Sequence, residues 1–132
     1  MLRASRPLFA AAQTLKATTG ITGLAVHPNP LPALTKVYNQ TLSSLSALPA
    51  TSVYRQAAEA LTKHRLAVVE KANGDITAVE KELGSIVEVT LKEAETELSL
   101  SGQVADWKVW EPLEEKPHPD QWRYFDPTGD SL

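Results

Sequence analysis

Apolar residues recur at spacings of three and four in three long stretches of the chain, the pattern of helices that bury one side. These stretches span residues 31–48, 53–73 and 85–101, and a shorter helix is expected at 76–83. The pattern therefore predicts an all-α chain without a sheet. The side chains expected to be buried are Leu31, Leu34, Val37, Tyr38, Leu42, Leu45 and Leu48 in the first long helix, Tyr54, Ala58, Leu61, Val68 and Ala72 in the second, and Val87, Leu91, Ala94 and Leu98 in the third.

Capping residues and glycines mark where these helices begin and end. Asn29 and Asp75 are expected N-caps, because a short polar side chain can accept a backbone N–H at that position. Gly74 and Gly84 are expected terminators, since glycine adopts the left-handed conformation without a steric penalty. Helices joined by short loops pack antiparallel, so we expect a small up-down-up three-helix bundle at residues 31–106.

The third long helix is expected to begin with a capping box, in which Ser85 accepts an amide and Glu88 reaches back. Gly102 costs a helix about 1 kcal/mol relative to alanine, so the helix either bends or ends near that residue. Trp107 lies nine residues past Leu98 in the helical register, which predicts that its side chain points into the core.

The most specific stretch of the chain follows this helix. Residues 107–125 hold five of the eight aromatic side chains, and Pro112, Pro117 and Pro119 exclude an ordinary helix or a central strand. A Trp that leaves water hides about 150–250 Å² of surface, so we expect this C-terminal strap (residues 107–132) to lie on something. It either covers the protein's own helices or docks on another chain, because tryptophan is enriched among interface anchors.

Residues 1–30 read as an N-terminal extension followed by an extended segment. Residues 1–16 bear arginine, lack acids and are amphipathic if coiled, a composition typical of a mitochondrial targeting segment that we expect to be retained. A plain exposed extension is the alternative. The glycines within 17–26 invite a phosphate-binding interpretation, but no Gly-Lys-Ser/Thr follows them, so a segment laid along the surface is favoured. Residues 27–32 then form a proline-rich elbow.

Charge is distributed unevenly along the 132 residues. Residues 1–58 contain no acid and carry about +5, whereas the remainder carries about −8. This split suits docking between charged neighbours. The chain has no cysteine, which excludes disulfides and thiolate sites, and its three histidines are scattered. No Walker loop, nucleophile elbow or His-Glu-x-x-His motif is present, and nucleic-acid binding is disfavoured.

Several motifs resemble those of the alpha-subcomplex subunit 5 family, accessory subunits of mitochondrial NADH:ubiquinone oxidoreductase (respiratory complex I). They are Lys16-Ala-Thr-Thr-Gly-Ile-Thr-Gly-Leu-Ala-Val26, Leu48-Pro49 with Tyr54-Arg55, Leu66-Ala-Val-Val69, Glu93-Ala-Glu95 with Glu97-Leu98, Trp107-Lys-Val-Trp-Glu-Pro-Leu113 and Asp120-Gln-Trp122. The chain departs from the family pattern in its longer N-terminal extension, its Pro28/Pro30/Pro32 elbow, Gly102 and the tail beyond Phe125.

The resemblance implies a non-catalytic, structural subunit on the matrix-facing hydrophilic arm at the mitochondrial inner membrane. Its implied partners are core and accessory subunits of complex I. The resemblance implies that the chain has no cofactor, no small-molecule substrate, no nucleic-acid partner and no membrane span of its own. A helical adaptor of another matrix complex and a small enzyme or sugar-binding module with a Trp platform are the alternatives. The implied interface and packing residues are Trp107, Trp110, Glu111, Pro112, Leu113, Asp120, Gln121, Trp122, Thr18, Thr19, Gly20, Gly23 and Leu24.

Overall fold

A computed structural model describes residues 16–119 and 121, which contain four helices and no strand. The helices are α1 (Pro30–Ser46), α2 (Val53–Lys71), α3 (Ile76–Leu83) and α4 (Val87–Trp107). The prediction of an all-helical chain is confirmed. Three of the helices are long, as expected, and the short α3 makes the total four within the described residues.

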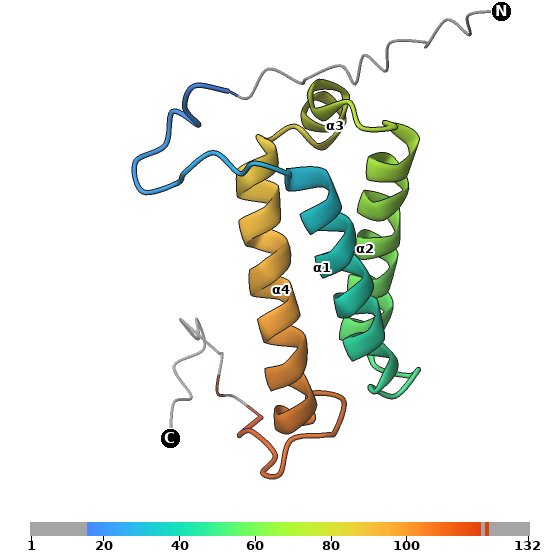
Figure 1. Cartoon of the computed structure of the whole chain (residues 1–132). Coiled ribbons are helices and arrows are strands. Elements are labelled where there is room, and N and C mark those ends of the chain that lie inside the picture. The colour runs from blue at the N-terminus through green and yellow to red at the C-terminus, as the bar shows by residue number, and fades with distance from the viewer. Residues whose placement is uncertain (1–15, 120, 122–132) are drawn as a thin grey trace, which may run out of the picture.

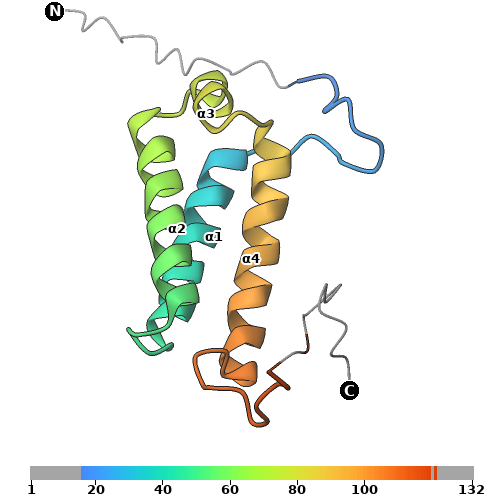
Figure 2. The ribbon, with the colours of Figure 1, turned by 180° about the vertical axis from the view of Figure 1, so that it is seen from behind.

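The three long helices alternate in direction, with α1 and α4 running one way and α2 the other (Figure 1). The short α3 sits at the end of the molecule where α2 leads into α4. α1 packs closely along both α2 and α4, whereas α2 and α4 meet mainly through side chains, including the Arg65–Glu93 ion pair. Seen from behind, α1 lies at the back between these two helices (Figure 2). The helices therefore form two packed pairs that share α1.

The buried apolar side chains gather in two clusters, one toward each end of the long helices. Near α3, the cluster includes Leu34, Tyr38, Val79 and Val87. Near the α1–α2 loop, the second cluster is built from Leu45, Leu48, Ala58 and Val104. Burial of such groups stabilises the fold by about 25 cal/mol per Å² of apolar surface, so these two clusters hold α1 to its neighbours.

Small polar residues separate the two clusters. In sequence, buried Thr41 and Thr62 lie between members of the two clusters, and buried Ser101 lies three residues before Val104 of the second cluster. The Thr41 hydroxyl donates to the Val37 carbonyl (3.0 Å), and the Ser101 hydroxyl contacts the Ser44 hydroxyl (2.8 Å). Each hydroxyl is satisfied locally, as buried polar groups generally are. Small polar side chains therefore stand between the two apolar clusters along α1 and α2.

Most of the expected buried positions are correct, but Leu61 is wrong. Leu34, Leu45 and Val87 are buried, whereas Leu61 is 52% exposed and its neighbour Thr62 is buried instead. The apolar spacing along α2 is compatible with either residue facing inward. The register that buries Ala58 places Thr62 one turn later on the same side, and this rotates Leu61 outward.

The helix ends combine confirmed caps with two corrections. Asp75 accepts the amides of Thr77 and Ala78 (2.9 and 3.3 Å), and Gly84 ends α3 with φ of 73°. Asn29 occupies the N-cap of α1, but its side chain makes no capping hydrogen bond. The predicted capping box at Ser85 and Glu88 is also wrong, because α4 starts at Val87 after Ile86.

The amide at the start of α4 is capped from another helix. Val87 N–H donates to Glu80 Oε1 (2.9 Å), and Glu80 belongs to α3. Ser85 instead pairs with the Thr90 hydroxyl (2.8 Å). A carboxylate at a helix N-terminus also interacts favourably with the helix dipole, so Glu80 performs the task that the sequence pattern assigned to Ser85 and Glu88.

Gly102 neither breaks nor ends α4. The helix continues to Trp107 and stops at Lys108, which adopts a left-handed conformation (φ 50°) while its N–H donates to the Val104 carbonyl (3.1 Å). Gly102 is exposed, so the packing of α4 does not require a side chain at this position. The five residues beyond it are held by the burial of Val104, which offsets the cost of one glycine.

Candidate interaction surfaces

The start of the C-terminal strap reverses direction immediately after α4. Glu111 N–H donates to the Lys108 carbonyl (2.9 Å), which closes a turn and folds Trp110 back toward the bundle. Trp110 is half-buried and packs against the cluster that contains Leu48 and Val104. Trp107, in contrast, is 62% exposed. The expectation that Trp107 points inward is therefore wrong, and Trp110 takes the inward position.

The remaining described residues of the strap lie on the surface. Glu111 and Pro112 are exposed, and Leu113 has 73% of its surface in contact with solvent. Gln121 is exposed as well. Asp120 and Trp122 lie outside the described residues. Trp107, Val109 and Leu113 thus present apolar groups to the outside at the end of α4, which favours contact with another surface over a role in covering this chain.

The N-terminal site residues form a turn rather than a fully extended segment. Leu24 N–H donates to the Ile21 carbonyl (3.2 Å), and the Thr19 hydroxyl donates to the Leu24 carbonyl (2.7 Å). Gly20 N–H donates to the Thr18 hydroxyl (3.2 Å). Gly20 and Gly23 both have positive φ (75° and 82°), which explains glycine at these two positions. The structure brings Thr18, Thr19, Gly20, Gly23 and Leu24 together in this turn.

The two groups of predicted interface residues do not meet. The turn at 18–24 lies at the α3 end of the molecule, and the strap begins at the opposite end of α4 (Figure 1). They define two separate surfaces, roughly the length of α4 apart, which is about 30 Å for its 21 residues at 1.5 Å per residue. A partner touching both surfaces would have to run along the whole bundle.

A lysine just before the N-terminal turn fixes it to the helices. Lys16 Nζ forms ion pairs with Glu80 of α3 and with Glu88 of α4 (3.3 Å to Glu88). The Glu88 side chain is only 3% exposed. Burial alone would lower the pKa of Lys16, but the hydrogen bonds and negative charges of the two glutamates outweigh it and raise that pKa. We call this arrangement the Lys16 clamp.

The Lys16 clamp was not foreseen from the sequence, although one signal for it was present. Glu88 lies three residues before Leu91 and so shares the inward side of α4 with apolar residues. An acid in an apolar stripe requires a buried counter-ion. Among the cations that precede α1, Lys16 is the nearest to it in sequence, and it supplies that charge.

The ion pairs and the lowered carboxyl pKa values predict that the folded chain loses stability in acid. Burial would raise the pKa of Glu80, but hydrogen bonds from Lys16 and Val87 N–H hold it below the usual range. Hydrogen bonds from Lys63 and Arg55 lower the pKa of Glu59. Groups whose folded pKa is depressed contribute stability above their unfolded pKa and lose it as pH falls through the folded value.

We therefore expect the free energy of unfolding to be nearly constant from about pH 6 to 8 and to fall below about pH 4.5, the ordinary range of glutamate titration. Urea unfolding at a series of pH values measures this. The Glu80→Gln variant should show a shallower loss in acid than the unchanged chain. An identical acid profile in the two proteins would contradict the assignment of Glu80.

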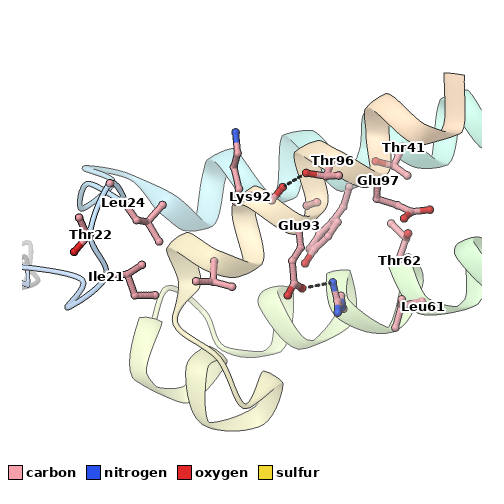
Figure 3. Close-up of a pocket in the computed structure, with 15 residues that line it drawn as sticks. Ile21, Thr22, Leu24, Thr41, Leu61, Thr62, Lys92, Glu93, Thr96 and Glu97 are labelled. Atoms are coloured by element: carbon pink, nitrogen blue, oxygen red, sulfur yellow. Dashed lines mark hydrogen bonds and ion pairs between the residues drawn. The ribbon is translucent and has the colours of Figure 1, made fainter. Parts of the chain in front are cut away.

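A third feature is a groove between α2 and α4, with α1 as its floor. Its volume is about 670 Å³, and Ile21, Thr22 and Leu24 close the end nearest α3 (Figure 3). Arg65 and Glu93 form an ion pair across it (3.3 Å), and the Tyr54 hydroxyl donates to Glu97 (2.6 Å). Burial, followed by this hydrogen bond to a carboxylate, raises the pKa of Tyr54. Sequence patterning gave no sign of this groove.

Residues 16–119 and 121 contain no group of three or more His, Cys, Asp or Glu side chains placed to hold a metal ion. Over the same residues, none of the helices combines the length and the apolar character needed to cross a bilayer. The exposed apolar groups on a helical framework define a small all-helical interaction protein.

Comparison with known proteins identifies its family. A family profile described as "ETC complex I subunit conserved region" matches residues 23–88, half of the chain. The Candida albicans protein named NADH dehydrogenase (ubiquinone) 1 alpha subcomplex subunit MCI4 is 49% identical over 109 residues, which cover 81% of this chain and 78% of that protein. NADH dehydrogenase (ubiquinone) 1 alpha subcomplex subunit 5 of Bos taurus is 40% identical over 111 residues, covering 83% and 95%. The chain belongs to the alpha-subcomplex subunit 5 family of complex I.

A further relative matches over a shorter range. The Neurospora crassa protein named NADH-ubiquinone oxidoreductase 29.9 kDa subunit, mitochondrial, is 60% identical over 53 residues, which cover 40% of this chain and 19% of that protein. The family resemblance carried by the sequence motifs is confirmed by these matches.

Proposed function

We propose that this chain is a non-catalytic accessory subunit of mitochondrial respiratory complex I, held on the matrix-facing arm by neighbouring core and accessory subunits. The observation that carries the proposal is its membership of a family whose relatives are named as subunits of NADH dehydrogenase. The role is to support assembly and stability of the complex that passes electrons from NADH to ubiquinone. The chain itself carries no redox group in this role.

The interaction surfaces support such a role physically. Trp107 and Leu113 at the end of α4 leave large apolar groups exposed, and burial of each against a partner would contribute a gross gain of a few kcal/mol at about 25 cal/mol per Å². Residues 31–106 then act as the helical spacer, with the 1–30 region at one end and the 107–132 strap at the other. The matrix-side placement at the inner membrane follows from the proposed partners.

Removing the chain should separate a structural role from a catalytic one. We expect cells that lack it to accumulate less assembled complex I, while NADH:ubiquinone oxidoreductase activity per assembled complex stays unchanged, because no reacting group is lost. Quantifying the complex on native gels beside its activity measures both. Re-expression of the full chain is the control.

Two outcomes would contradict the proposal. A normal amount of complex with reduced turnover would assign the chain a part in the reaction. Unchanged amount and turnover, together with loss of a different matrix complex, would favour the alternative of a helical adaptor elsewhere in the matrix.

A further inference from the structure

Glu88 is an acid that the fold buries. Its side chain is 3% exposed, in the first turn of α4 and next to Val87 of the apolar cluster near α3. Among the lysines and arginines of residues 16–119 and 121, Lys16 alone forms an ion pair with it (3.3 Å). Removing one partner of a buried ion pair is strongly destabilising, because a charge is then left in a poorly solvated site. The folded chain therefore depends on the ammonium group of Lys16.

The same ammonium group ties the N-terminal segment to the junction of α3 and α4. Lys16 Nζ pairs with Glu80 Oε1, and that oxygen also accepts the Val87 N–H at the start of α4 (2.9 Å). The Glu80 and Glu88 carboxylates belong to different helices. One lysine side chain thus neutralises two acids and joins three segments of the chain.

Within the part of the chain that the structure describes, the turn at residues 18–24 has no polar attachment to the helices of its own. Its hydrogen bonds are internal, such as those from the Thr19 hydroxyl to the Leu24 carbonyl (2.7 Å) and from Leu24 N–H to the Ile21 carbonyl (3.2 Å). Ile21 is 49% exposed, so apolar packing covers only part of the turn. Lys16 stands just before the turn, at the α3 end of the molecule (Figure 1), and holds it in place.

The sequence ahead of Lys16 differs in kind from the sequence behind it. Residues 1–15 lie outside the described residues, and their acid-free, arginine-bearing composition is typical of a targeting segment, a substrate for proteolytic processing. We propose that Lys16 is the first residue that the mature chain requires, so that N-terminal processing ends at or before the bond between residues 15 and 16. The consequence for assembly rests on the proposed function, because the turn is one of the contact surfaces proposed there.

Hydrolysis one bond further along undoes the Lys16 clamp. An endopeptidase that adds water across the bond between Lys16 and Ala17 leaves a carboxylate on the released piece and an α-ammonium group on Ala17. This ammonium group sits on the backbone, a full lysine side chain away from the position of Lys16 Nζ, so it reaches Glu88 only if the turn moves. The buried acid is left without a counter-ion, and the turn loses its attachment to α3 and α4.

Two truncated chains that differ by one residue test this boundary. A chain that begins at Lys16 should unfold at the same urea concentration as the full chain and be retained equally in the assembled complex. In a chain that begins at Ala17, the folding equilibrium constant should be smaller by about tenfold or more, as expected when a buried charged group loses its partner. Retention should fall by a similar factor. Equal behaviour of the two truncated chains would overturn the inference.

Glu88→Gln in the chain that begins at Ala17 separates stability from positioning. The neutral amide needs no counter-ion, so the folding equilibrium constant should recover most of the lost factor. Because Lys16 is still absent, amide hydrogen exchange at residues 18–24 should stay about tenfold faster than in the full chain, and retention should remain low. Recovery of slow exchange in the turn would overturn the positioning role of Lys16.

Limited proteolysis tests the same boundary in the full-length chain. Thermolysin should trim the folded chain to a fragment that begins at or before Lys16, because a hydrogen-bonded turn resists cleavage. In Lys16→Met, cleavage should move into residues 17–24 and be about tenfold faster, in proportion to the population of the open turn. Lys36→Met is the matched control, since Lys36 is exposed on α1, and it should leave the cleavage pattern unchanged. Equally fast cleavage within 17–24 in all three proteins would contradict the proposal.

The N-terminus of the chain purified from mitochondria reports the processing that occurs in the cell. Mass spectrometry of its N-terminal peptide should find a first residue at Lys16 or earlier, and a first residue at Ala17 or later would overturn the inference. Failure of the proposed function is distinguishable from failure here. If the chain migrates with a different assembly while the truncated chains and the proteolysis behave as expected, the boundary at Lys16 stands and the proposed function is wrong.

Discussion

Replacing Trp110 with alanine should lower the free energy of unfolding of the isolated chain by about 2–3 kcal/mol, somewhat less than the ~3–5 kcal/mol typical of a fully buried aromatic residue. Trp110 is half-buried against Leu48 and Val104 at the end of α4, and its removal leaves a cavity there. Chemical denaturation of the purified chain, followed by far-UV circular dichroism, measures the change.

Trp107→Ala is the matched control, and it should change retention in the complex rather than the stability of the isolated chain. Because this side chain is 62% exposed, its loss should change the free energy of unfolding by less than about 0.5 kcal/mol. Retention of the variant in the assembled complex should fall markedly if Trp107 is one of the interface anchors. Equal destabilisation by the two substitutions would mean that the turn after Lys108 does not select Trp110 as the inward residue.

The second large effect concerns the Lys16 clamp. Lys16→Met keeps the length of the side chain but removes the charge that faces Glu88, whose carboxylate is 3% exposed. A buried acceptor that loses its partner costs about 1–3 kcal/mol, and more if it stays charged. We therefore expect a loss of about 1–3 kcal/mol, together with release of the N-terminal turn from α3 and α4.

Neutralising Glu88 tests the cause of that loss. In the Lys16→Met background, Glu88→Gln should recover part of the lost stability, because the buried carboxylate no longer needs a counter-ion. Hydrogen exchange at the amides of residues 18–24 should rise in the single variant. If the double variant is as destabilised as the sum of the two single variants, Lys16 and Glu88 do not interact energetically.

Helix positions were predictable because periodic apolar burial dominates local structure. Leu34, Leu45 and Leu91 each continue a stripe whose other members agree on the same inward face, so the assignment does not depend on any one residue. Leu61 failed because α2 is sparse in large apolar groups, and a threonine next to a leucine gives no unique register. The packing of Ala58 and Thr62 against the other helices determines the register of α2.

The interaction surfaces were less predictable because they depend on where the chain turns. Nine residues at about 100° per residue place Trp107 on the side of α4 opposite Leu98, so the helical register turns Trp107 outward and the expectation misjudged it. The left-handed Lys108 instead reverses the chain and brings Trp110 into place. Glu80 capping Val87 and Lys16 pairing with Glu88 join residues 7 and 72 positions apart, and such long-range pairings leave little trace in local sequence patterns.

The most direct test of the central claim is mass spectrometry of native-gel slices of mitochondrial membranes. If the chain is an accessory subunit of respiratory complex I, its peptides should peak in the same slice as the core subunits of that complex and in a constant ratio to them. The profile should follow the complex when its amount is lowered by loss of a core subunit. A peak in a different assembly, or only at the mass of the free chain, would contradict the account.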